Sequence, residues 1–261
     1  MKVKVIVLTG YGINAEKELA WAFELAGGEP SIIHLEEIIE NKKKLDEYQI
    51  LAFPGGFSFG DHIASGRVFA NKVKNNLLDE LKNFISKDKL VIGICNGFQI
   101  ITKLGILPDF ENNQEQVVSL IENDSGHFED RWVWVKLVEN NSPWLADIDK
   151  LYLPVRHGEG KFVAKDDATL DKIINDKQVA LKYFNPDSVN EAGYPFNPNG
   201  STADIAGILN KNGNVFGLMP HPEAYIFREN HPRWTEFSEE IKNELTGLKI
   251  FQNGINYFKK F

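Results

Sequence analysis

The sequence predicts an α/β protein, with a mostly parallel central sheet that is flanked by helices and carries a β-rich flank. In the first part of the chain, apolar segments rich in β-branched residues alternate with helix-forming segments, which is the pattern of a sheet covered on both faces. Farther along, several segments alternate polar and apolar residues, as half-buried antiparallel strands do. The 261 residues and the 43% hydrophobic content suit one large domain, which we expect to span residues 1–261.

The N-terminal elements are expected in β-turn-α order. Residues 2–8 have strand character, Gly10 and Gly12 mark a turn, and helix-forming residues run from 15 to 26. Three more strands and one helix are expected at 30–34, 49–53, 89–94 and 63–86, respectively. These alternating elements predict the parallel part of the sheet.

The C-terminal part changes character. Alternating residues predict antiparallel strands at 131–137, 161–165 and 178–184, separated by Asn, Asp, Gly and Pro clusters. The last apolar strand is expected at 215–220, and helical spacing over 247–261 predicts a terminal helix that packs on the sheet.

Composition narrows the class of partner. Lys and Arg total 29 against 37 Asp and Glu, a net charge of −8, so we expect no nucleic-acid partner. No apolar stretch approaches the roughly 20 residues that span a bilayer, and we expect no membrane association. A single cysteine cannot form an intrachain disulfide, and the N-terminus alternates lysine with valine instead of forming a signal-peptide core. We therefore expect a cytoplasmic protein that binds small molecules or other proteins.

The only cysteine, Cys95, lies between Gly93 and Gly97 at the junction of a predicted strand and helix. This G-x-C-x-G spacing is typical of a nucleophile elbow, in which the glycines relieve crowding in a sharp turn. The N-terminus of the following helix favours a thiolate. A buried structural cysteine is the alternative; the flanking glycines favour the nucleophile.

Two histidines are candidate bases. His221 follows the last predicted strand, and Glu223 two positions later would point to the same side of an extended chain and orient the imidazole. His157 also has a glutamate two positions later, but it lies in a glycine-rich segment that we expect to be a loop. Placement at the sheet edge favours His221 as the base. The alternative interpretation of the segment around His221 is a surface turn with a solvated charge.

A third site follows the predicted strand 49–53, where the chain continues as Pro54-Gly55-Gly56. A backbone N–H of this turn and that of Asn96 are candidates for an oxyanion hole, and a plain turn is the alternative. Gln99, four residues after the cysteine, shares its helix face and is a candidate for the pocket, unless it is a helix-surface amide. The sequence contains neither a phosphate-binding G-x-x-x-x-G-K-[ST] loop nor a metal-ligand cluster, so we expect no metal site and no cofactor in this chain.

Six motifs occur in a fixed order along the chain: PGGFSFGDH (54–62), GICNGFQ (93–99), SGHFEDRWVWVKL (125–137), RHGEGKF (156–162), FNPNGSTADIAGI (196–208) and GLMPHPEA (217–224). Together they closely resemble the class I glutamine amidotransferases, and within these the glutaminase subunits of phosphoribosylformylglycinamidine synthases of purine biosynthesis. The resemblance covers essentially the whole chain and implies a flavodoxin-like three-layer sandwich.

The resemblance implies a role for each candidate residue. It makes Cys95 the nucleophile, His221 the general base and then acid, and Glu223 the residue that orients the imidazole. It assigns the oxyanion hole to the turn that contains Gly56, beside Asn96. The glutamine-binding residues implied by the motifs are Gln99, His157 and Gly158.

The implied chemistry is hydrolysis of the glutamine side-chain amide through a cysteine thioester, which releases ammonia. The ammonia would pass to a large synthetase subunit that uses ATP and magnesium to convert formylglycinamide ribonucleotide to the amidine. A small third subunit would bridge the two.

One segment, 224–246, departs from the resemblance as an extra loop after the triad histidine. It is a candidate for partner contact or an insertion packed for stability. Two alternative functions are a glutaminase of another pathway, or a cysteine peptidase-like hydrolase, on the same scaffold. A third alternative is a binding module whose thiol is structural or redox-sensing.

Overall fold

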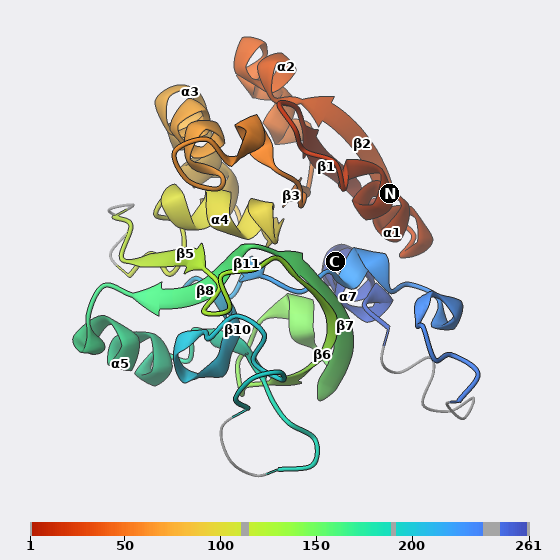
Figure 1. Ribbon diagram of the computed structural model, residues 1–261. Coiled ribbons are helices and arrows are strands. Elements are labelled where there is room, and N and C mark those ends of the chain that lie inside the picture. Colours follow the sequence, from red (N-terminus) through yellow and green to blue (C-terminus); the bar gives the residue numbers. More distant parts are fainter. Residues whose placement is uncertain (1, 111–114, 189–191, 237–245, 260–261) are drawn as a thin grey trace.

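The computed structural model describes residues 2–110, 115–188, 192–236 and 246–259 (Figure 1). Its first half alternates strands and helices as expected. The elements are β1 (Lys4–Thr9), α1 (Glu16–Leu25), β2 (Glu29–His34), α2 (Leu35–Glu40), β3 (Ile50–Phe53), α3 (Arg67–Ser86), β4 (Leu90–Ile94) and α4 (Asn96–Lys103). The predicted helix over 63–86 begins only at Arg67, because Gly66 before it has a left-handed backbone with φ 75°.

The second half is richer in strands than the sequence pattern indicates. Its elements are β5 (Val118–Glu122), β6 (Glu129–Leu137), β7 (Lys150–His157), β8 (Glu159–Ala164), α5 (Asp167–Asn175), β9 (Val179–Tyr183), β10 (Ile205–Leu209), β11 (Val215–Leu218) and α7 (Leu248–Lys259). The sequence analysis missed β5, β7 and β10, although it found their neighbours.

In the described part of the chain, nine strands form one sheet in the order β2-β1-β3-β4-β11-β10-β9-β6-β7. The pairs from β2 to β11 are parallel, and the remaining pairs are antiparallel. The predicted fold class is confirmed. Over the described residues the β-rich flank is, however, mostly a continuation of the main sheet, while β5 and β8 form a separate antiparallel pair.

Helices cover both faces of the parallel part of the sheet (Figure 1). On one face α1 packs against α7, where Phe23 and Phe251 meet edge to face at 5.0 Å and Gly254 lies against Trp144. On the other face α3 packs against α4. These aromatic side chains are fully buried, so the removal of their apolar surface from water stabilises the three layers.

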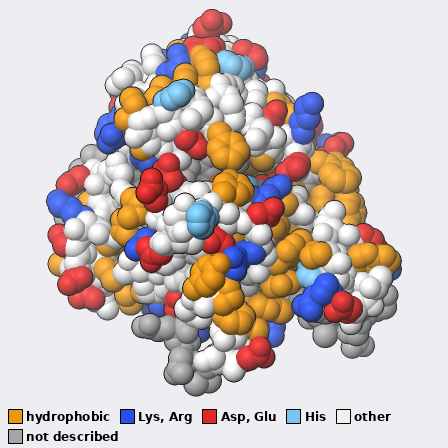
Figure 2. All heavy atoms as spheres, in the orientation of Figure 1, with side chains coloured by type: hydrophobic (Ala, Val, Ile, Leu, Met, Phe, Trp, Pro, Cys, Tyr) orange, Lys and Arg blue, Asp and Glu red, His pale blue; other side chains and the backbone are white. Residues whose placement is uncertain are grey.

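The surface mixes charges of both signs. Figure 2 shows acidic and basic side chains interspersed over one face, with hydrophobic side chains gathered in patches between them. Among the described residues, no helix is both long enough and apolar enough to cross a membrane.

The described part of the extra loop packs on the sheet. Tyr225 and His231 lie against Trp132 of β6, with ring centroids 5.0 and 4.7 Å away, respectively. Residues 237–245 of this loop lie outside the described residues.

Candidate active site

Cys95 occupies a sharp turn between β4 and α4. Its backbone has φ 51° and ψ −107°, a strained conformation for a residue with a side chain. The turn is held because the Cys95 N–H donates to the carbonyl of Leu218, at the end of β11, over 2.9 Å. A Cβ on Gly97 would collide with the carbonyl of Phe53, which explains the glycine after the cysteine. This is the elbow geometry that the sequence predicts.

His221 and Glu223 form a buried pair after β11. The Nδ1–H of His221 donates to Oε1 of Glu223 over 2.6 Å, and both side chains are almost fully buried. The contact between His221 and Glu223 is confirmed, but the extended chain from which the sequence analysis derived it is wrong. Residues Pro222–Ala224 form a 3₁₀ turn instead of an extended segment, and this turn carries the carboxylate back to the ring.

The charge state of His221 depends on its two neighbours. Burial alone would lower the pKa of His221, but the negative charges of Glu223 and Cys95 raise this pKa to about 10. Hydrogen bonds of the imidazole with the side chains of Cys95 and Glu223 raise the pKa of His221 further. The ring therefore suits an imidazolium that faces a thiolate, with Glu223 holding the opposite nitrogen.

Cys95 and His221 open into the same cavity, which has a volume of about 360 Å³. Its wall comes from six separate segments of the chain. The lining residues are Asn14, Ala15, Glu18, Gly56, Phe57, Cys95, Phe128, Arg156 and His221. The cavity thus offers a nucleophile, a base, and one charged side chain of each sign.

The glycine turn after β3 forms one side of this cavity. The Phe57 N–H donates to the Gly12 carbonyl over 3.0 Å, and the Ala15 N–H donates to the Gly55 carbonyl over 3.3 Å. Gly56 lines the cavity. A Cβ on Gly55 would lie 2.8 Å from Cε1 of His221, so only glycine lets the imidazole pack on this turn.

Asn96 has only its backbone N–H available for an oxyanion hole, because its side chain is engaged elsewhere. As the first residue of α4 its N–H has no partner inside the helix. Its side chain points elsewhere: Oδ1 accepts from the Ser58 N–H over 3.2 Å, and Nδ2 donates to Oε1 of Gln99 over 2.9 Å. The oxyanion role of Gly56 and Asn96 stays a prediction.

Gln99 does not reach the cavity. Its Nε2 donates to the carbonyl of Glu159 over 2.6 Å, while its Oε1 accepts from Asn96. Both ends of the amide are engaged by the protein, so the side chain does not point into the cavity, and a contact of Gln99 with glutamine stays a prediction. Helical spacing correctly places Gln99 on the same helix face as Cys95. The β7–β8 turn, however, covers the part of that face where Gln99 lies.

His157 is a strand residue instead of the loop residue that we expected. It ends β7 and is buried. Its Nδ1 lies 3.1 Å from Oδ1 of Asn123, and its Nε2 lies 3.5 Å from Nδ2 of Asn199. Burial, reinforced by the nearby charge of His221, lowers the pKa of His157 to about 3. A neutral, fully engaged imidazole is a poor candidate for a base or a ligand contact.

Gly158 forms the turn between β7 and β8, beside Phe128. Neither Gly158 nor His157 lines the 360 Å³ cavity, and a direct contact with glutamine stays a prediction for both.

The sequence analysis missed two charged cavity residues, Glu18 and Arg156. Nη2 of Arg156 lies 3.5 Å from Oε2 of Glu18, and both side chains are partly exposed. Glu18 lies in the first turn of α1, beyond the end of β1, and Arg156 precedes His157. A signal was present for Glu18 alone, because ligand sites in parallel sheets lie beyond the carboxyl ends of the strands, whereas Arg156 lies on an antiparallel strand.

Comparisons with known proteins give one consistent family. Residues 2–258 match the model of the CobB/CobQ-like glutamine amidotransferase domain. A protein of Methanococcus maripaludis strain C5, named phosphoribosylformylglycinamidine synthase subunit PurQ, is 43% identical over 100% of both chains. A protein of the same name from Dehalococcoides mccartyi is 41% identical over 99% of both chains.

A solved structure gives the same result. One chain of the structure titled PurLQS from Thermotoga maritima superposes with a TM-score of 0.73 at 33% identity, covering 99% of this chain and 100% of that one.

Proposed function

Because the chain belongs to the family of CobB/CobQ-like glutamine amidotransferase domains, we propose that it is the glutaminase subunit of phosphoribosylformylglycinamidine synthase in purine biosynthesis. The observation that carries this function is the Cys95 elbow, which opens into one cavity with His221, itself paired to Glu223. These three residues suffice for amide hydrolysis through a thioester.

In the first step the thiolate of Cys95 attacks the side-chain amide carbon of glutamine. The N–H groups of Gly56 and Asn96 stabilise the oxyanion that forms. The imidazolium of His221 donates its Nε2 proton to the amide nitrogen. The C–N bond then breaks, and ammonia leaves a γ-glutamyl thioester on Cys95.

In the second step water attacks the thioester carbon. His221, now neutral, accepts a proton from the water as the new C–O bond forms. The C–S bond breaks, glutamate leaves, and the thiolate and imidazolium return. Throughout, Glu223 holds the ring through Nδ1 and stabilises its positive charge.

Two charged side chains in the cavity suit the amino-acid end of glutamine. The guanidinium of Arg156 is complementary to the α-carboxylate, and the carboxylate of Glu18 is complementary to the α-ammonium group. Both groups line the cavity that contains Cys95, so a bound glutamine can extend its side chain toward the thiol.

The ammonia has to be used by another subunit, because the sequence contains no phosphate-binding loop. The partners are a large synthetase subunit, which binds ATP and magnesium, and a small bridging subunit. This chain itself needs no cofactor or metal, and the reaction takes place in the cytoplasm. The name of the Thermotoga maritima structure, PurLQS, supports an assembly of this kind.

The test is reconstitution. Co-purified with its synthetase and bridging subunits, the chain should release ammonia from glutamine and support amidine formation that depends on glutamine and ATP. An electrophilic glutamine analogue should label Cys95 alone, as mass spectrometry would show. Hydrolysis of a peptide panel in place of glutamine, or an adduct at another residue, would refute the proposal.

A further inference from the structure

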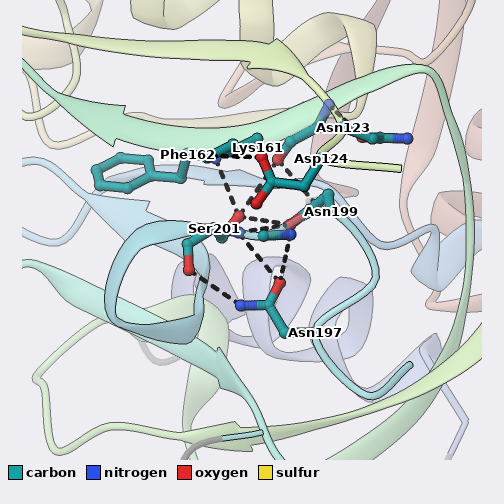
Figure 3. A network of polar contacts seen from close by, with 9 residues as sticks. Asn123, Asp124, Lys161, Phe162, Asn197, Asn199 and Ser201 are labelled. Atoms are coloured by element: carbon teal, nitrogen blue, oxygen red, sulfur yellow. Dashed lines mark hydrogen bonds and ion pairs between the residues drawn. The ribbon is translucent and has the colours of Figure 1, made fainter. Parts of the chain in front are cut away.

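The FNPNGS motif at residues 196–201 contributes nothing to the cavity wall, yet it forms a dense polar network (Figure 3). Oδ1 of Asn197 accepts from the N–H groups of Gly200 and Ser201 over 3.0 and 3.1 Å, respectively. Oδ1 of Asn199 accepts from the hydroxyl of Ser201 over 2.7 Å. Hydrogen bonds from its own side chains therefore stabilise the loop. The amide nitrogen of Asn199 takes no part in these bonds and points away from the loop.

That amide nitrogen contacts the β7–β8 turn. Nδ2 of Asn199 lies 2.9 Å from the Gly160 carbonyl, 3.2 Å from the hydroxyl of Tyr183 and 3.5 Å from Nε2 of His157. Asn199 is completely buried, so each of these contacts forms away from water.

A second asparagine holds the turn from the other side. Nδ2 of Asn123 donates to the His157 carbonyl over 2.7 Å, and its Oδ1 accepts from the Gly160 N–H over 3.0 Å. The same Oδ1 lies 3.1 Å from Nδ1 of His157. Asn123 and Asn199 thus engage both ring nitrogens of His157 and both backbone polar groups of Gly160.

The end of β7 is a wall of the active site. The Pro154 carbonyl accepts from the His221 N–H over 2.8 Å, and the Arg156 carbonyl lies 3.7 Å from the sulfur of Cys95. Arg156 is a lining residue of the cavity, and its Nη2 lies 3.5 Å from Oε2 of Glu18, another lining residue. In the described part of the chain β7 is the edge strand of its sheet, and β6 pairs with one side of it, so groups outside the sheet can hold the other side of its end.

We propose that Asn123 and Asn199 are positioning residues for glutamine: they clamp the β7–β8 turn and so keep Arg156 at the mouth of the Cys95 cavity. This inference rests on the proposed glutaminase function. His157 is the element through which the clamp acts, as a neutral ring with Nδ1–H as donor and Nε2 as acceptor. A protonated ring could not accept from Asn199, and the lowered pKa of His157 agrees with the neutral form.

The test uses the complete synthase complex and the variant Asn199→Asp, which keeps the shape of the side chain but removes the Nδ2 donor. We expect the KM for glutamine to rise about tenfold or more, while kcat changes by less than about threefold. The rate at which iodoacetamide alkylates Cys95 should stay within about twofold, because the triad is held by other elements.

The matched control is Asp124→Asn in the same network, because its carboxylate pairs with Lys161 and does not contact His157 (Figure 3). Its kinetic constants should equal those of the wild type. If Asn199→Asp instead lowers kcat in proportion to the folded fraction and leaves KM unchanged, the network is merely structural and the proposal fails.

A second readout does not depend on activity. Nitrogen-15 NMR of the imidazole should show His157 as the neutral Nδ1–H tautomer at pH 7 in the wild type, and a changed signal in Asn199→Asp. An unchanged signal in the variant would overturn the clamp. A wild-type complex that does not hydrolyse glutamine would refute the proposed function, and the imidazole signal would still decide whether the asparagines hold this ring.

Discussion

His221 donates a hydrogen bond of 2.6 Å from Nδ1 to Glu223, across a 3₁₀ turn that is buried beneath the candidate active site. The short turn fixes the ring orientation with only one residue between the partners. Because the carboxylate is almost completely buried, its charge acts on the imidazole with little screening by water. Burial by itself lowers the pKa of His221, and among the causes that raise this pKa the charge of Glu223 is the largest.

Replacing Glu223 by Gln should slow glutamine hydrolysis by on the order of 10²-fold or more, because the amide can hold the ring without stabilising the imidazolium. Loss of the negative charge should also lower the pKa of His221, so the alkaline limb of the activity profile should move to lower pH. The measurement is kcat/KM against pH in the assembled complex.

Glu159→Gln is the matched control, because Glu159 follows His157 at the same spacing but its carboxylate contacts the Ser65 N–H over 3.3 Å. This variant should lose much less of the rate of glutamine hydrolysis than Glu223→Gln does. If Glu159→Gln slowed glutamine hydrolysis more than Glu223→Gln, the assignment of His221 as the base would be wrong, and His157 would be the better candidate.

His157 should make the protein less stable in acid. Its pKa of about 3 lies below the ordinary value of 6.5, so between these values the unfolded chain binds a proton that the native protein does not. The free energy of unfolding should therefore fall as pH decreases through this window, with His157 contributing up to about 1.4 kcal/mol per pH unit.

In His157→Gln this contribution disappears, because glutamine does not titrate. Chemical denaturation of both proteins at several pH values measures the difference between the two slopes, whatever the absolute stability of the variant. Equal slopes would show that His157 is protonated to the same extent in the native and unfolded states.

Arg156→Ala should raise the KM for glutamine by about tenfold or more, because a charge-assisted contact with the α-carboxylate is lost. Glu18→Gln should raise it less, because the amide still accepts a hydrogen bond from the α-ammonium group. Steady-state kinetics in the complex measures both, with Lys177→Ala as the control, since the ion pair of Lys177 with Glu139 is exposed. A KM that is unchanged in Arg156→Ala would remove Arg156 from the substrate site.

The sequence predicted those features whose cause is local. The Cys95 elbow follows from glycine spacing at one strand-helix junction, and the parallel half of the sheet follows from the alternation of apolar and helix-forming segments. Contacts between distant segments were not accessible in this way. Glu18 and Arg156 meet only because α1 and the end of β7 flank the same cavity.

The errors have physical causes too. His157 was expected in a loop because glycines surround it, but Gly160 is required because a Cβ there would collide with the imidazole ring. Gln99 was expected in the pocket because residues four apart share a helix face, and the pattern does not reveal that the Glu159 carbonyl covers that face. The nearest partners in the pairing of β7 with β6, Lys136 and Lys150, are 14 residues apart along the chain, and this pairing left no periodic signal that we recognised.

Release of ammonia and its use belong to different subunits in the proposed reaction, and the Cys95→Ala variant tests this division. The thiol, His221 and the oxyanion donors act only on glutamine, while neither a phosphate-binding loop in the sequence nor a cluster of metal ligands among the described residues is available for the ATP-dependent step. In the reconstituted complex, Cys95→Ala should stop amidine formation from glutamine. Synthesis from added ammonium salt should continue at close to the wild-type rate, because the synthetase can take ammonia from solution. A variant that assembles normally in size-exclusion chromatography but loses both activities would show that the Cys95 turn also serves the ATP-dependent step.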